Sequence, residues 1–141
     1  MGLLDRFRKK KEKKVNIETK ETITELEQLC GDDKETYEAL HHTMFLDPRK
    51  PGTSMKEAAE NAKKYEKAKD LVKARMWYEI AGGLAIYEGN VKKVVEFFSE
   101  IVKISPDTKY TTYLERGLLK NPEKAVAKAQ EYYKQYLESK P

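Results

Sequence analysis

Apolar residues along most of this 141-residue chain recur at intervals of three and four positions, which is the spacing of one face of an α-helix. No stretch alternates apolar and polar residues as a half-buried strand does, and no Asn-Gly or Asp-Gly turn separates two apolar runs. Glycine, proline and capping residues stand between the apolar segments, where helices begin and end. The pattern predicts an all-α fold of about seven helices joined by short connections.

Two helices are expected near the start of this pattern. Thr22 begins the first, whose apolar positions run to Cys30 and which ends at Gly31. The second extends from about Asp33 to Phe45. Its apolar face consists of Tyr37, Leu40, Met44 and Phe45. The residues leave open whether this leading hairpin packs on the helices that follow or stands apart from them.

The third and fourth helices have distinct N-terminal signals. Ser54 and Glu57 form a Ser-x-x-Glu capping box at the start of the third helix. Asp70 is the expected N-cap of the fourth. The residues predicted to face inward are Ala58, Ala62, Tyr65 and Ala68 on the third helix and Leu71, Ala74, Trp77, Tyr78, Ala81, Leu84 and Ala85 on the fourth.

The fourth helix contains a pair of glycines, Gly82 and Gly83. A glycine inside a helix costs about 1 kcal/mol relative to alanine, so the pair indicates a compensating gain in packing. We expect a neighbouring helix to approach closely at this point. A phosphate-binding loop is not indicated, because no strand precedes the pair and no Gly-Lys-Ser/Thr sequence follows it.

Three further helices are expected in the C-terminal half. Gly89 ends the fourth helix and Asn90 caps the fifth. Ser105 and Asn121, each followed by proline, are the expected N-caps of the sixth and seventh helices. The apolar stripe of the fifth helix is Val91, Val94, Val95, Phe98, Ile101 and Val102, and the seventh helix carries Ala125, Ala129, Tyr132, Tyr133 and Tyr136.

The predicted helix starts recur at a nearly constant interval. Ser54 and Asn90 are 36 residues apart, as are Asp70 and Pro106, and Asn90 and Asn121 are 31 apart. A two-helix unit that recurs at this interval is typical of an α-solenoid, in which each hairpin buries the apolar face of the one before it.

The central part of the chain resembles the tetratricopeptide-repeat family. Between Ala62 and Ala81, small and aromatic residues alternate in the small-large-small rhythm of that family. A second, overlapping register places Tyr78, Ala81, Gly82, Ala85, Gly89, Val94, Phe98, Ile101 and Pro106 at the family's helix A, turn, helix B and terminal-proline positions. The overlap indicates either continuous stacking of similar helices or a degenerate member of the wider superfamily.

The resemblance has a limited extent. The Trp-x-x-Leu-Gly opening of the family is not reproduced, and residues 106–141 match it mainly through helix spacing and small residues. The resemblance implies a short stack of antiparallel helical hairpins over residues 54–138 and a protein–protein interaction scaffold. It carries over no ligand-binding residue.

Charge is distributed unevenly along the chain. The whole chain has a formal net charge of +4, but residues 1–14 hold seven basic and two acidic side chains, a net of +5, so the remainder is −1. A near-neutral body argues against a large nucleic-acid-binding face, which needs clustered lysine and arginine. Lysine and glutamate are abundant while the chain has four asparagines and three glutamines, a bias reported for proteins that work at high temperature.

The basic N-terminal segment is the sharpest functional feature of the sequence. On a short helix, Leu3, Leu4 and Phe7 share one face, and a lysine run follows, as in small membrane-surface anchors. Each apolar side chain contributes about 1.5–3 kcal/mol when fully buried and each basic one roughly 1 kcal/mol on anionic lipid, enough for weak, reversible attachment. A disordered, solubilising tail fits the same residues equally well. The residues expected to contact a membrane or phosphates are Leu3, Leu4, Arg6, Phe7, Arg8, Lys9, Lys10, Lys11, Lys13 and Lys14.

No catalytic, cofactor or metal site is predicted. Cys30 is the only cysteine, and we expect it to be a small buried apolar residue. His41 and His42 point about 100° apart on a helix, so they do not chelate one ion side by side, and no nucleophile stands in an activating motif. The residues put forward as aromatic contacts for a partner are Tyr132, Tyr133 and Tyr136, because neighbouring tyrosines do not all face inward.

These observations define one domain and one leading hypothesis. We expect a flexible basic tail over residues 1–19 and an all-helical domain over 20–141, composed of a leading hairpin (20–46), a loop with two prolines (47–53) and the stacked helices (54–138). With no secretory signal and no apolar run of about 18 residues, the chain is expected to be cytoplasmic, either free or bound through its tail at the inner face of the membrane. The predicted function is a non-enzymatic adaptor for a protein partner. The alternative is a nucleic-acid-associated assembly protein whose tail contacts phosphates.

Overall fold

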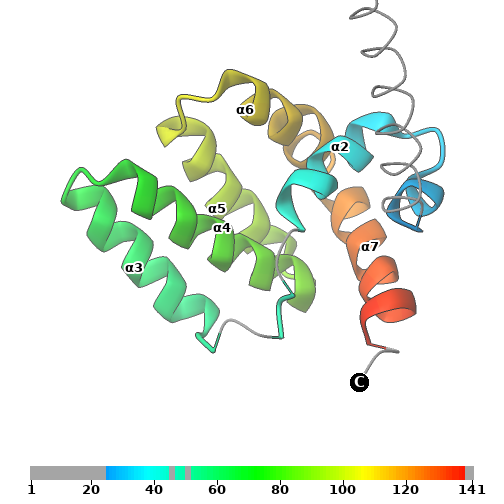
Figure 1. Ribbon diagram of the computed structural model, residues 1–141, viewed down its shortest axis with the longest axis horizontal. Coiled ribbons are helices and arrows are strands. Elements are labelled where there is room, and N and C mark those ends of the chain that lie inside the picture. Colours follow the sequence, from blue (N-terminus) through cyan, green and yellow to red (C-terminus); the bar gives the residue numbers. More distant parts are fainter. Residues whose placement is uncertain (1–24, 45–46, 50–51, 139–141) are drawn as a thin grey trace, which may run out of the picture.

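The computed structural model describes residues 25–44, 47–49 and 52–138, and these form helices joined by short connections (Figure 1). Residues 25–30 are helical. The helices that follow are α2 (Lys34–Thr43), α3 (Met55–Lys67), α4 (Leu71–Glu88), α5 (Val91–Ile104), α6 (Thr108–Leu114) and α7 (Pro122–Tyr132). Two π-helical segments, η1 (Glu115–Leu119) and η2 (Tyr133–Leu137), extend α6 and α7. Since the described ranges contain seven helices and no strand, the predicted all-α fold is confirmed.

Most helices begin at the residue that the sequence indicates. An N-cap side chain accepts a hydrogen bond from the backbone N–H three residues later and so satisfies one of the free donors of the first turn. The predicted caps Ser54, Asp70, Asn90 and Asn121 all make this bond, at 3.1, 3.2, 3.2 and 3.4 Å respectively. Asp33 does the same for α2, at 3.1 Å. The placement of these helices is therefore set locally.

The sixth helix begins two residues later than the sequence predicts. Ser105 was expected to cap it, but Asp107 is the N-cap, and its carboxylate accepts the N–H of Tyr110 at 3.1 Å. Ser105 instead ends α5, with the extended backbone that a following proline favours. Its hydroxyl contacts the N–H of Asp107 at 3.3 Å and the guanidinium of Arg75 at 3.2 Å, so it is engaged in joining α4 to the α5–α6 connection.

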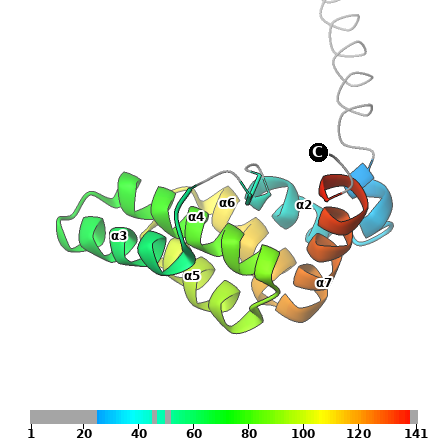
Figure 2. The ribbon, with the colours of Figure 1, turned by 90° about the horizontal axis from the view of Figure 1, so that it is seen from below.

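Helices α3, α4 and α5 lie side by side with alternating direction and form one layer (Figures 1 and 2). Both connections in this layer are tight turns with one left-handed residue. At the first, Lys69 has φ +61° and the N–H of Asp70 donates to the carbonyl of Tyr65 at 2.9 Å. At the second, Gly89 has φ +72° and the N–H of Asn90 donates to Ala85 at 2.9 Å. These turns fix α4 between its two neighbours in the chain.

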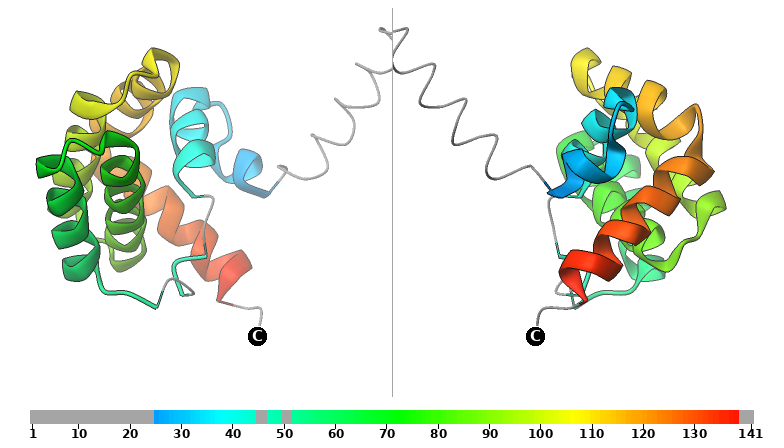
Figure 3. Two further views of the ribbon diagram at one scale, coloured as in Figure 1. Left: turned by 60° about the vertical axis from the view of Figure 1, so that its left-hand side comes forward. Right: turned by 90° about the vertical axis from the view of Figure 1, so that its right-hand side faces the viewer.

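The leading hairpin packs against the C-terminal half of the molecule, which the sequence had left open. Helix α2 contacts η1, α6 and α7, and the side views in Figure 3 place α2 and α7 together at the end away from α3. Helix α2 and η1 are in close contact at Gly117, whose missing side chain leaves room for the backbone carbonyl of Glu35. An ion pair between Lys124 of α7 and Asp33 at the start of α2 joins the same elements.

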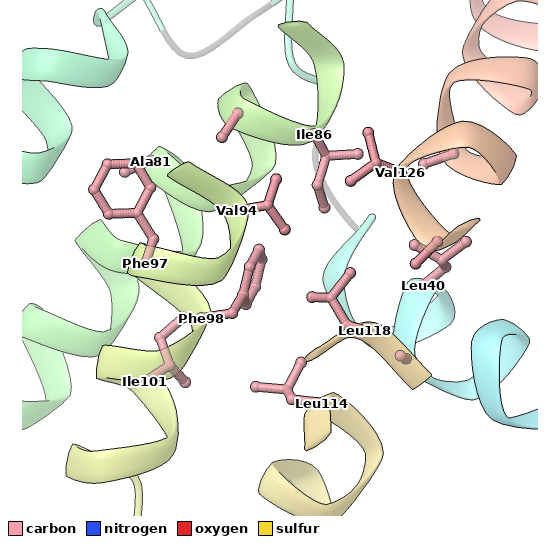
Figure 4. Packing of buried hydrophobic residues seen from close by; sticks show 14 of the residues in the cluster. Leu40, Ala81, Ile86, Val94, Phe97, Phe98, Ile101, Leu114, Leu118 and Val126 are labelled. Carbon is pink, nitrogen blue, oxygen red and sulfur yellow. The ribbon is translucent and has the colours of Figure 1, made fainter. Parts of the chain in front are cut away.

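One apolar core connects the two halves (Figure 4). Its largest fully buried side chains are Tyr78, Phe98, Leu40, Ile86, Ile101, Leu114, Leu118 and Val94. They come from α2, α4, α5, α6 and η1, so no pair of neighbouring helices contains the core by itself. Cys30 is also buried, as predicted.

The glycine pair in α4 behaves as predicted at one of its two positions. A Cβ added at Gly82 would lie 2.5 and 2.7 Å from two ring carbons of Phe98 in α5, so the absent side chain permits this contact. At Gly83 an added Cβ would meet nothing within 4 Å. The prediction of close helix approach is therefore confirmed for Gly82 and wrong for Gly83, which faces away from the helices that pack on α4.

Candidate functional site

Three large apolar side chains are exposed in the part of the chain that the structure describes, and all three belong to the first two turns of α4. Leu71 is 44% exposed, Val72 82% and Met76 46%. The apolar period predicted that Leu71 would face inward, and that prediction is wrong because no described element covers the side of the first turn on which Leu71 lies. Val72 and Met76 are four residues apart and so share one face of the helix.

These side chains border a groove between the start of α4 and the end of α5. We call it the α4 groove; its volume is about 450 Å³, within the range of sites that hold small ligands or a partner's side chains. It is lined by Leu71, Val72, Arg75, Met76, Glu79, Ile104 and Pro106. Five of these seven residues are apolar, and the two charged ones are on α4, one and two turns after Leu71.

The polar side of the α4 groove is a network that joins α4 to α6. Arg75 pairs with Glu79 at 3.6 Å, donates to the hydroxyl of Ser105 at 3.2 Å and lies over the ring of Tyr110, 4.5 Å from its centroid. The hydroxyl of Tyr110 donates to the second carboxylate oxygen of Glu79 at 2.8 Å. Because each of these groups restrains another, the groove has a preformed polar floor.

Burial shifts the acidity of this network. Desolvation raises the pKa of Glu79 above its usual range, while the hydrogen bond from Tyr110 and the charge of Arg75 oppose the shift. Desolvation and the neighbouring carboxylate of Glu79 raise the pKa of Tyr110. The phenol therefore keeps its proton at neutral pH and acts as the donor to Glu79. The side chain of Arg75 remains 31% exposed against 15% for Glu79, so the cation is the more accessible member of the pair.

A second depression, with a volume of about 440 Å³, lies between α3 and α5 where Tyr78 of α4 also lines it; we call it the α3–α5 cleft. It is lined by Lys63, Glu66, Lys67, Tyr78, Glu96, Phe97 and Glu100. The hydroxyl of Tyr78 donates to Glu66 at 2.6 Å, and Lys93 pairs with Glu96 at 2.8 Å. Both signs of charge line this cleft, and its aromatic residues Tyr78 and Phe97 are themselves buried, so little apolar surface is offered to a partner.

The predicted aromatic contact residues separate into two groups. Tyr133 is only 4% exposed and packs edge-on against Tyr87 with ring centroids 5.3 Å apart, so it belongs to the core. Tyr132 and Tyr136 are half-buried, with ring centroids 5.4 Å apart. These two are the members of the predicted set that keep accessible ring surface.

The remaining candidate residues from the sequence are the basic tail and the two histidines. The basic tail residues, from Leu3 to Lys14, lie outside the described residues. His41 and His42 are exposed, and His42 contacts the carbonyl of Glu38 at 2.7 Å and stacks on Tyr113. Among the residues described, no three histidine, cysteine or acidic side chains are grouped so as to hold a metal ion. Within the same ranges, no helix has the length and apolar character needed to cross a bilayer.

In the comparisons with known proteins, no family model, no curated protein sequence and no solved structure matches the chain. The site is therefore defined by its geometry. Sequence reasoning missed the α4 groove, although one signal for it was present: Val72 is a large apolar residue outside the stripe assigned to the buried face of the fourth helix. A bulky apolar side chain beside, and not on, the buried stripe indicates apolar surface on the solvent side.

Proposed function

We propose that this protein is a non-enzymatic interaction scaffold that binds a protein partner in the α4 groove. The observation that supports the proposal is the clustering of Leu71, Val72 and Met76, the large exposed apolar side chains of the described chain, beside a preformed groove. Burying such a cluster stabilises a complex by about 25 cal/mol for each Å² of apolar surface removed from water. Methionine at the rim also adapts its shape to different partners.

The arrangement of the layer is consistent with this role. Two observations support a tetratricopeptide-type stack. Helices α3, α4 and α5 pack side by side with alternating direction, and the missing side chain of Gly82 lets α4 pack closely on Phe98 of α5. In the proposal, the layer holds the first turns of α4 rigidly while α2, α6 and α7 stabilise it from the other end. The polar network around Arg75 then keeps the groove open before a partner arrives.

Val72→Asp is the variant that tests the proposal. Val72 is 82% exposed and occupies the first turn of α4, where a carboxylate interacts favourably with the helix dipole, so the fold should persist. Full-length protein and the variant are used in parallel for crosslinking and affinity capture from native lysate, and Lys67→Gln in the α3–α5 cleft serves as a control. The proposal expects a specific partner that the wild type and Lys67→Gln capture and Val72→Asp does not. If every captured protein binds all three equally, the α4 groove is not the binding site.

We also propose that the basic tail recruits the scaffold to an anionic membrane surface. The supporting observation is the combination of Leu3, Leu4 and Phe7 with the net charge of +5 in residues 1–14. The test is co-sedimentation of the full chain with vesicles that contain or lack phosphatidylserine, with a triple glutamine variant at the three apolar positions. Binding to anionic vesicles that the variant loses supports the proposal. Salt-sensitive binding to RNA or DNA that the variant retains would instead favour the nucleic-acid alternative.

A further inference from the structure

The α4 groove has a charge asymmetry that restricts what kind of partner segment fits it. Arg75 is its accessible charge, and a guanidinium has five N–H donors in a planar fork. In the described structure, Arg75 uses its Nε toward Glu79 and its Nη1 toward Ser105, and its Nη2 donates to no described residue. Donors are therefore left over beside the apolar walls of the groove.

The acidic groups near the groove are already engaged. Asp70, the N-cap of α4, accepts the backbone N–H of Lys73 at 3.2 Å and pairs with the ammonium group of the same residue at 3.9 Å. Glu79 is the acidic residue that lines the groove, and both of its oxygens are occupied, one by Tyr110 and the other by Arg75. A basic partner residue would have to compete with Arg75 and Tyr110 for this carboxylate, whose side chain is only 15% exposed, whereas an acidic one finds free donors on Arg75.

We infer that the occupant of the α4 groove is a peptide segment of a partner protein in which an Asp or Glu adjoins large apolar side chains. The carboxylate accepts the free N–H groups of Arg75, while the apolar side chains cover Leu71, Val72 and Met76. This inference rests on the proposed function and adds to it the chemistry of the partner. Charge-assisted hydrogen bonds of this kind are about twice as strong as neutral ones.

A second copy of the chain is a less suitable occupant. Stable protein dimers bury about 800 Å² on each partner, over 20–30 residues. The exposed apolar cluster of the α4 groove comprises only three side chains, Leu71, Val72 and Met76, so it matches a short segment better than a folded subunit. Peptide segments commonly dock through a few apolar side chains in a groove with one polar contact that fixes their orientation.

The test is selection of binders from a displayed library of random 12-residue peptides against the full-length protein, followed by anisotropy titration of synthetic peptides. We expect the selected peptides to share one Asp or Glu beside at least two large apolar residues, and to lose binding to Val72→Asp. Replacing the peptide carboxylate with its amide should weaken binding to the wild-type protein about tenfold, the ratio expected for a charge-assisted hydrogen bond.

The same amide replacement should change binding to Arg75→Gln by threefold or less, and Lys67→Gln should behave as the wild type. Because the peptide change is measured on the unaltered protein, it remains decisive even if Arg75→Gln is poorly folded. Peptides that bind in the α4 groove but contain no acidic residue, or whose amide forms bind within threefold of the acids, overturn the inference and leave the proposed function standing. Peptides insensitive to Val72→Asp, or a failure to select any binder, count against both. Loss of a dimer in Val72→Asp by analytical ultracentrifugation would identify a second copy as the occupant and also overturn the inference.

Discussion

Replacing Gly117 with alanine should displace α2, because Gly117 lies where η1 contacts α2. The added Cβ would collide with the backbone carbonyl of Glu35 and would lie 2.6 Å from the Cβ of Ala39. Carbon atoms in favourable contact are about 3.5–4.0 Å apart, so the gap must open by about 1 Å or more. The obstructing atoms belong to the backbone and first side-chain carbon of α2, so a rotamer change does not relieve the clash.

The expected loss of stability follows from what α2 buries. Overpacking a core costs about 1–3 kcal/mol, and the displaced helix also exposes part of Leu40, a fully buried side chain whose burial contributes about 1.5–3 kcal/mol. The better helix propensity of alanine offsets about 1 kcal/mol of this loss in stability. The net result should be a decrease of about 1–4 kcal/mol in the free energy of unfolding, a large fraction of the stability of a small domain.

Urea unfolding followed by circular dichroism measures this loss, and hydrogen exchange locates it. We expect the amides of residues 34–43 to lose protection in Gly117→Ala more than those of α3 to α5. The matched control is Gly83→Ala, where the added Cβ meets nothing within 4 Å, so the same substitution should stabilise by about 0.5–1 kcal/mol. Should Gly117→Ala unfold within about 0.5 kcal/mol of the wild type, the packing of α2 against η1 would be refuted. An equal loss in Gly83→Ala would show that the loss does not come from the contact with α2.

Three further predictions concern single positions. In Gly82→Ala the new Cβ meets ring carbons of Phe98 at 2.5 and 2.7 Å. Because a ring shifts more easily than backbone, urea unfolding should show a loss of stability of about 1–3 kcal/mol, smaller than a clash with backbone would cause. An unchanged unfolding midpoint would contradict the contact. Lys69→Gly removes a side chain from a residue at φ +61° and should raise the stability by about 1 kcal/mol, seen as a higher Tm; a lower Tm would show that the turn is not strained. Hydrogen bonds, chiefly from Lys124, lower the pKa of Asp33 from 3.8 to about 2. The folded-state pKa lies below the unfolded one, so this stabilisation is present above about pH 4 and is lost as the pH falls toward 2. In Asp33→Asn, the fall in unfolding free energy over that window should be smaller than in the wild type, and identical acid profiles would argue against the interaction.

The sequence by itself determined the fold class and most of the helix starts. Ser54, Asp70, Asn90 and Asn121 cap their helices as predicted, because a cap depends only on a side chain and an N–H three residues away. Among the helix starts that the structure describes, the one placed wrongly, at Ser105 instead of Asp107, lies where the Ser105 hydroxyl is engaged by Arg75 from another helix.

Only the tertiary structure decided where α2 packs and which part of α4 faces solvent. The contact of Gly117 with Glu35 joins residues far apart in the chain, and no local period encodes it. Leu71 falls on the same helical stripe as buried residues, yet it is exposed because no described element covers its side of the first turn. Helical periodicity reports which side chains share a face, whereas exposure depends on whether another element covers that face, and the candidate site exists because at this place none of the described elements does.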